Sequence, residues 1–167
     1  YNLKTIEENT KNINCIINLC GILYERKHGD FFKVHTDVPD SLGRISLKNK
    51  IKTLIHVSAL GVSKTSESKY SRSKAEGENK LLKHFPNGKI LRPSLIYGKG
   101  DNFFGQFSNI ATISPVLPII SRFTKFQPVF VEDVSKAIVK LIKDYKDKNT
   151  IYELAGDTVY SFEELLK

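Results

Sequence analysis

The sequence predicts an α/β fold, in which a parallel sheet is covered by helices. Short apolar runs occur at residues 13–19, 53–58 and 89–91. They are continuous rather than alternating, which is typical of strands buried on both faces. Segments with helical spacing lie between them, at 31–45 and 70–85. This order predicts parallel strands joined by helical crossovers. A length of 167 residues with 40% hydrophobic residues fits one domain.

The later part of the chain continues the alternation. From Val134, apolar residues recur at i, i+3, i+4, i+7 and i+8, which predicts an amphipathic helix, and Asp133 is placed to cap its first turn. A short strand is expected at 151–155. Ser161 and Glu164 then form a capping-box pattern, which predicts a further helix.

Composition excludes several function classes. The net charge is +8, but only five of the 26 basic residues are arginine and the lysines are scattered, so we expect no nucleic-acid binding. The apolar runs are far shorter than the ~20 residues of a membrane span, so no transmembrane segment is expected. Cys15 and Cys20 match no zinc spacing. We therefore predict reduced thiols and no metal site.

Tyr70 and Lys74 are the main candidates for chemistry. They lie four residues apart at the start of a predicted helix, which places the phenol and the ammonium on one face. A free phenol has a pKa near ~10, and a nearby cation would favour the phenolate. The pair alone is weak evidence in a chain rich in tyrosine and lysine, so the interpretation depends on its context.

That context is four segments in a fixed order, which resemble extended short-chain dehydrogenases. They are CIINLCGILYER (15–26), LIHVSALGV (54–62), ILRPSLIYGKGDNFF (90–104) and FQPVFVEDVSKAI (126–138). The resemblance implies a Rossmann-type doubly wound sheet, represented here by strand four onward, and binding of NAD or NADP. It also implies roles for individual residues. The cofactor-binding residues would be Asn18, Gly21, Tyr70, Lys74, Pro93 and Ser94, and the catalytic residues would be Tyr70, Lys74 and Ser58.

The amino-acid sequences of these segments are most similar to an atypical branch of this superfamily. That branch includes the dehydrogenase-like accessory subunit of respiratory complex I and its bacterial relatives. The resemblance implies a structural or redox-sensing partner of the respiratory NADH dehydrogenase and quinone system. It places such a protein in the bacterial cytoplasm, including the inner face of the membrane, or on the matrix side of the mitochondrion. It also implies one partial dinucleotide-binding domain over residues 1–167, with the substrate-side region beginning after about residue 99.

Two departures from the family pattern weaken an enzymatic claim. The position of the carbonyl-binding serine or threonine aligns with Ala59, with Ser58 one residue early. None of the ten glycines forms the G-x-x-G-x-x-G turn that holds a pyrophosphate. We therefore expect this turn and the first three strands on chain upstream of Tyr1, which would leave residues 13–19 as a sheet edge.

Two alternatives remain beside the respiratory partner. One is an active NAD(P)-dependent reductase or nucleotide-sugar epimerase or dehydratase that uses Tyr70 and Lys74. The other is an inactive remnant of a truncated gene. The histidines favour structural roles: His56 is expected to be a hydrogen-bonded core residue, and His35 and Asp37 are expected to be packing or surface residues.

Overall fold

The computed structural model describes residues 3–101, 123–144 and 150–165. These form two compact units, Tyr1–Arg92 with Ile138–Tyr152, and Pro93–Ala137 with Glu153–Lys167. Most of the segment in which the substrate-side region was expected to begin lies outside the described residues. The helices are α1 (Leu3–Asn9), α2 (Asp30–Phe32), α3 (Val38–Lys48), α4 (Lys69–His84), α6 (Val131–Lys143) and α7 (Phe162–Leu165), with a π-helical turn η1 (Lys33–Asp37). The strands are β1 (Cys15–Asn18), β2 (Thr53–Val57), β3 (Lys89–Pro93), β4 (Ile96–Tyr97), β5 (Lys125–Phe126), β6 (Val129–Phe130), β7 (Ile151–Leu154) and β8 (Tyr160–Ser161).

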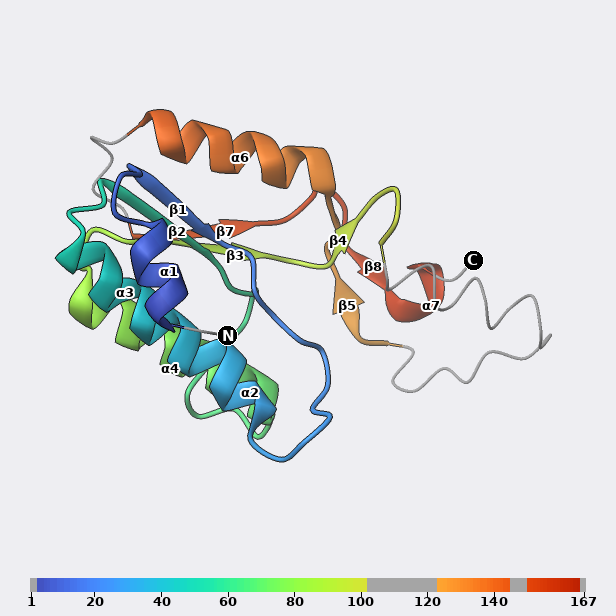
Figure 1. The fold of residues 1–167 in the computed structure, drawn as a ribbon. Coiled ribbons are helices and arrows are strands. Elements are labelled where there is room, and N and C mark those ends of the chain that lie inside the picture. Colours follow the sequence, from blue (N-terminus) through green and yellow to red (C-terminus); the bar gives the residue numbers. More distant parts are fainter. Residues whose placement is uncertain (1–2, 102–122, 145–149, 166–167) are drawn as a thin grey trace. The chain divides into compact units, whose positions relative to one another are not determined.

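The main sheet has the order β1-β2-β3-β7 (Figure 1). β1 pairs with β2 in parallel, with Ile16 opposite Leu54, and β2 pairs with β3 in parallel, with His56 opposite Ile90. The predicted α/β class and the parallel strands are confirmed. β1 is an edge strand among the described residues, and Ile17 on it is 41% exposed.

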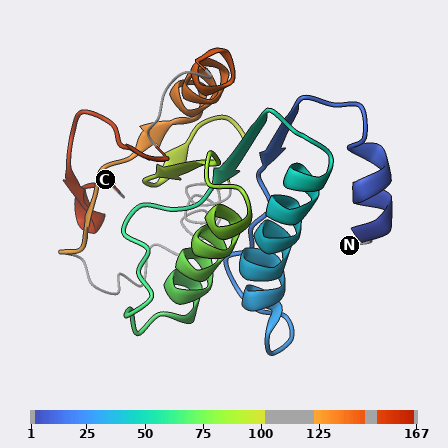
Figure 2. The same cartoon turned by 90° about the vertical axis from the view of Figure 1, so that its left-hand side faces the viewer.

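The first unit is held together by an apolar core between this sheet and two helices. Leu54 and Ile90 from the strands pack with Leu42 of α3 and Leu81 of α4, and Leu54, Ile90 and Leu81 are fully buried. α3 and α4 lie side by side (Figure 2). The continuous apolar runs of the sequence are therefore strands with a helical layer on them.

The helix expected over 31–45 is interrupted. It begins as α2, widens into η1 over Lys33–Asp37 and continues as α3. A π-helical turn holds one more residue than an α-helical turn, so it shifts which side chains face the core. A uniform 3.6-residue period across this segment is therefore wrong.

The second unit contains two small sheets, the parallel pair β4–β6 and the antiparallel pair β5–β8. The predicted capping box is confirmed, because the Ser161 amide donates to the Glu164 carboxylate (2.7 Å) and the Glu164 amide donates to Ser161 Oγ (3.2 Å). The capping role of Asp133 is wrong. α6 begins at Val131, so Asp133 lies inside the first turn, where its carboxylate pairs with Lys136 (3.0 Å).

Candidate functional site

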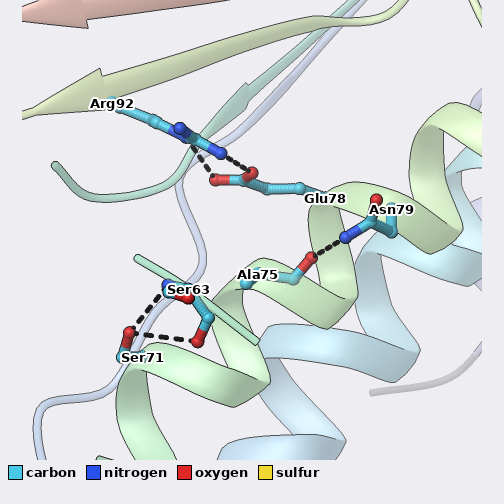
Figure 3. Close-up of polar contacts among 6 residues, drawn as sticks. All are labelled: Ser63, Ser71, Ala75, Glu78, Asn79 and Arg92. Atoms are coloured by element: carbon cyan, nitrogen blue, oxygen red, sulfur yellow. Dashed lines mark hydrogen bonds and ion pairs between the residues drawn. The ribbon is translucent and has the colours of Figure 1, made fainter. Parts of the chain in front are cut away.

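The site is built around the first two turns of α4. Ser68 caps this helix, and its Oγ accepts a hydrogen bond from the Ser71 amide. Ser71 also ties the helix to the loop that follows β2, because its Oγ accepts from the Ser63 amide (2.9 Å) and donates to the Ser63 carbonyl (3.4 Å) (Figure 3). Tyr70 lies in this first turn and Lys74 one turn later.

Lys74 is a buried cation, with 5% of its surface exposed. Its Nζ donates to the Val57 carbonyl oxygen at 3.3 Å and lies 5.8 Å from the centre of the Tyr70 ring. Burial lowers the pKa of Lys74 to about 8, although the charge of Glu78 acts in the opposite direction. An ammonium has three donors. Within the described chain the Lys74 ammonium has one hydrogen-bond acceptor, so it can donate to a ligand.

The carboxylate of Glu78 is already engaged. It accepts from Arg92 Nη2 at 2.6 Å and from Arg92 Nε at 3.1 Å, as Figure 3 shows. Glu78 is 3% exposed, so this is a buried, bidentate ion pair between α4 and β3. Lys74 therefore lies near a negative charge that is directed to another cation.

Tyr70 differs from the expectation in its pKa. Its ring packs edge-on against Phe31 (5.8 Å between ring centres) and His35 (5.2 Å). Burial raises the pKa of Tyr70 above its usual value of 10. The expected lowering by Lys74 is absent from this structure, so the phenol is a weaker acid here than a free tyrosine.

Asn18 and Gly21 line the turn after β1. Asn18 is 3% exposed, and both ends of its amide are used: Oδ1 accepts from the Cys20 amide (3.1 Å) and Nδ2 bonds His56 Nδ1 (3.0 Å). A Cβ placed on Gly21 would lie 3.4 Å from Lys74 Nζ, so this turn passes directly beside the ammonium. Contact of Asn18 or Gly21 with a cofactor stays a prediction.

Ser58, Pro93 and Ser94 are the remaining predicted site residues. Ser58 is 5% exposed and directly follows β2, and its buried Oγ has no hydrogen-bond partner among the described residues. Pro93 ends β3, and the Ser94 amide donates to the Leu154 carbonyl (2.7 Å). Both belong to the second unit, and their contact with a cofactor stays a prediction.

One histidine contributes more than the sequence indicated, and a second has the role that was expected. His56 is the buried core residue that was expected, but His35 was assigned only to packing or surface, and the structure places it in contact with Tyr70. Asp37, in contrast, is exposed. Both imidazoles are fully buried. Burial, and then the charge of Lys74, lower the pKa of His35 to about 4 and that of His56 to about 3. No motif in the sequence identifies His35, because its role comes from contacts with residues far along the chain.

Acidification from pH 6.5 to 5 should lower the free energy of unfolding. His35 and His56 stay neutral in the folded chain over this range, whereas the unfolded chain takes up protons below its histidine pKa of about 6.5. The expected loss is about 2 kcal/mol for each ring. Urea denaturation at several pH values measures it. The exposed His28→Asn control should keep the full dependence, and stability that is constant or rising on acidification would contradict the assignment.

Two further searches concern other kinds of site. Among the described residues, no group of three or more histidine, cysteine, aspartate or glutamate side chains is arranged to hold a metal ion. The helices within residues 3–101, 123–144 and 150–165 are all too short or too polar to cross a bilayer.

Comparison with known proteins identifies the family of this chain. The model of the RmlD substrate binding domain family matches residues 63–165. NADH dehydrogenase [ubiquinone] 1 alpha subcomplex subunit 9, a mitochondrial protein of Mus musculus, is 36% identical over 165 residues, which cover 98% of this chain and 44% of the relative. This chain thus spans less than half the length of that relative.

Two solved structures have the same fold. A dTDP-4-dehydrorhamnose reductase from Clostridium acetobutylicum superposes with a TM-score of 0.82 at 17% identity, covering 99% of this chain and 64% of that one. MoeE5, in complex with UDP-glucose and NAD, superposes with a TM-score of 0.83 at 14% identity, with the same coverage. These likenesses establish a Rossmann-like fold. The matched model shows that the chain belongs to the RmlD substrate binding domain family, and the solved structures show that it has the Rossmann-type fold predicted from its sequence.

Proposed function

We propose that this chain is part of a nicotinamide-dinucleotide-binding protein that serves the respiratory NADH dehydrogenase as a structural or redox-sensing partner. The single observation that carries the dinucleotide part is the buried ammonium of Lys74. Among the described residues it has one hydrogen-bond acceptor, so two of its donors are available, and it lies beside Tyr70 and the Gly21 turn. The carboxylate of Glu78, one turn along the helix, is held by Arg92. A ribose of a dinucleotide offers hydroxyl oxygens that suit such a donor.

The residues present fit the ribose and nicotinamide end of NAD or NADP. Lys74 would donate to a ribose hydroxyl, Tyr70 would lie beside the same ribose, and the Asn18–Gly21 turn would border the ring. Ser58 Oγ, which has no partner within the described parts of the chain, would donate to a carbonyl oxygen. When bound, the dinucleotide would supply hydride transfer. The glycine pattern for the pyrophosphate is absent from this sequence, so these residues would provide only part of the binding site.

Two observations favour the role of a structural or redox-sensing partner over that of an active enzyme. Burial raises the pKa of Tyr70, which makes proton transfer from the phenol harder. Ala59 stands where a carbonyl-polarising hydroxyl is expected. The respiratory assignment rests on the 36% identity to the mitochondrial subunit. It would place this protein in mitochondria, or at the corresponding membrane face of a bacterium.

The second candidate is an active reductase or epimerase. Two observations favour it: the Tyr70–Lys74 pair and a hollow in the second unit. This cleft of about 560 Å³ is lined by groups that include Tyr97, Asp133 and Asp157, and none of the described residues that line it is a lysine, arginine or histidine. We propose that residues after about 99 begin a substrate-side region, in which this cleft would take an uncharged, hydroxyl-rich group.

The test titrates the protein at its native length with NADPH and with NADH, followed by nicotinamide fluorescence. Lys74→Met should weaken binding at least about tenfold, because the donor to the ribose is lost. Lys83→Met, on the exposed last turn of the same helix, is the matched control and should bind as the wild type does. Wild-type protein that binds neither dinucleotide would refute the proposal.

A second measurement separates partner from enzyme. Removal of the protein from its cells should lower the amount of assembled NADH dehydrogenase on native gels, and Tyr70→Phe should restore it fully. An unchanged assembly would refute the respiratory role. Carbonyl reduction that disappears in Tyr70→Phe would establish the reductase instead.

A further inference from the structure

The contact between η1 and α4 is unusually close. η1 buries His35 and Thr36, and the hydroxyl of Thr36 donates to the Ser73 carbonyl of α4 at 2.8 Å. Gly77 faces the same turn, and a Cβ placed there would overlap the carbonyl oxygen of His35. π-helical turns are rare and occur often at functional sites. Here the turn presses the His35 ring against the part of α4 that carries Tyr70.

Both ring nitrogens of His35 are hydrogen-bonded. The Ile22 amide donates to Nε2 at 3.0 Å, so Nε2 carries no proton and the neutral ring is protonated on Nδ1. Nδ1 then donates to Ser73 Oγ at 3.0 Å, and that hydroxyl donates to the Tyr70 carbonyl at 2.8 Å. One continuous chain of hydrogen bonds therefore joins the turn after β1 to the backbone of Tyr70.

The ring of His35 also contacts the Tyr70 side chain. It stacks on Phe31 with 5.3 Å between ring centres and a 20° interplanar angle, and it meets Tyr70 edge-on at 5.2 Å and 86°. The Tyr70 ring thus contacts two aromatic groups that stack on each other. The same histidine contacts both the Tyr70 side chain and, through Ser73, the Tyr70 backbone.

We infer that His35 is a positioning residue, which holds the turn after β1 and the Tyr70 turn of α4 in the arrangement that a dinucleotide requires. This inference rests on the proposed function. His35 anchors the turn after β1 at the Ile22 amide. Ile22 directly follows Gly21, which lies beside the Lys74 ammonium. Loss of the two hydrogen bonds would free this turn and the phenol even where the packing volume is kept.

The test compares two replacements of His35 in the protein at its native length. His35→Phe keeps an aromatic ring against Phe31 and Tyr70 but has no hydrogen-bonding nitrogen. His35→Gln has an amide oxygen that can accept from Ile22 and an amide nitrogen that can donate to Ser73. His84→Phe is the matched control, because it removes a histidine that bonds Asp40 (3.1 Å) at the other end of α4.

Two readouts are taken on each variant. The first is hydrogen exchange of the Ile22 amide, relative to that of the Phe85 amide, which bonds the Leu81 carbonyl at the far end of α4. The second is affinity for NADPH and NADH. His35→Phe should speed Ile22 exchange at least about tenfold and weaken dinucleotide binding by a similar factor, at an unchanged Phe85 rate. His35→Gln should restore both, and His84→Phe should change neither.

The outcomes separate this inference from the proposed function. Wild-type protein that binds no dinucleotide would overturn the proposed function and the positioning role with it. Unchanged Ile22 exchange in His35→Phe, or equal behaviour of the Phe and Gln variants, would overturn this inference alone, because the ring would then act only by packing. Comparable losses in His84→Phe would overturn it as well.

Discussion

Leucine in place of Arg92 is expected to lower the free energy of unfolding by about 3–5 kcal/mol. The carboxylate of Glu78 is 3% exposed and accepts both of its short hydrogen bonds from this guanidinium. Without Arg92 it would be a buried charge that has lost its ion-pair partner. Urea denaturation, followed by circular dichroism, measures the loss.

The double variant Glu78→Leu with Arg92→Leu should recover most of the stability, because apolar replacement of a whole buried ion pair is often close to neutral. Lys64→Leu is the control. It breaks an exposed ion pair with Glu76, which lies on the same helix as Glu78, and the Lys64 side chain is 53% exposed. The free energy of unfolding should fall by less than about 1 kcal/mol. An Arg92→Leu protein within that range would show that the Glu78–Arg92 pair contributes no more than an exposed one.

Gly77→Ala should destabilise the protein by about 2–3 kcal/mol. Alanine is the better helix former by about 1 kcal/mol, so an exposed helical position would show the opposite sign. At Gly77 the added methyl group would overlap the His35 carbonyl and lie 3.3 Å from Pro39 Cγ, so α4 and η1 would have to separate. Thermal unfolding gives the sign directly.

Asn79→Ala is the matched control for Gly77→Ala. Asn79 is exposed on the same helix, where its side chain donates to the Ala75 carbonyl at 2.7 Å (Figure 3). This substitution should change stability by no more than about 0.5 kcal/mol. A Gly77→Ala protein that is more stable than the wild type would show that the helices tolerate the methyl group and that the close contact is not required.

The sheet could be predicted from the sequence because its signal is local. The runs at 13–19, 53–58 and 89–91 became β1, β2 and β3, with ends that differ by one or two residues and with parallel registers where the pairing is described. Tyr70 and Lys74 likewise share a face of α4, because four-residue spacing alone decides it.

The long-range contacts of the site and the pKa values that depend on them could not be predicted in the same way. The π-helical turn at His35 is in contact with Gly77, 42 positions along the chain, and no helical period in residues 31–45 reveals such a contact. The raised pKa of Tyr70 and the lowered pKa of Lys74 both follow from burial by the assembled fold. Composition and spacing say which groups are present, while tertiary packing decides their protonation.

The groups around the Lys74 ammonium link ligand binding to the stability of the whole molecule. The ammonium donates to the Val57 carbonyl, and burial together with this cation keeps the imidazoles of His35 and His56 uncharged at neutral pH. The positive charge of Lys74 would therefore favour a ligand group with an electron-rich oxygen, and the charge of that group would matter more than its shape. Because such a visitor would favour the native state over the denatured ensemble, occupancy and resistance to heat should rise together.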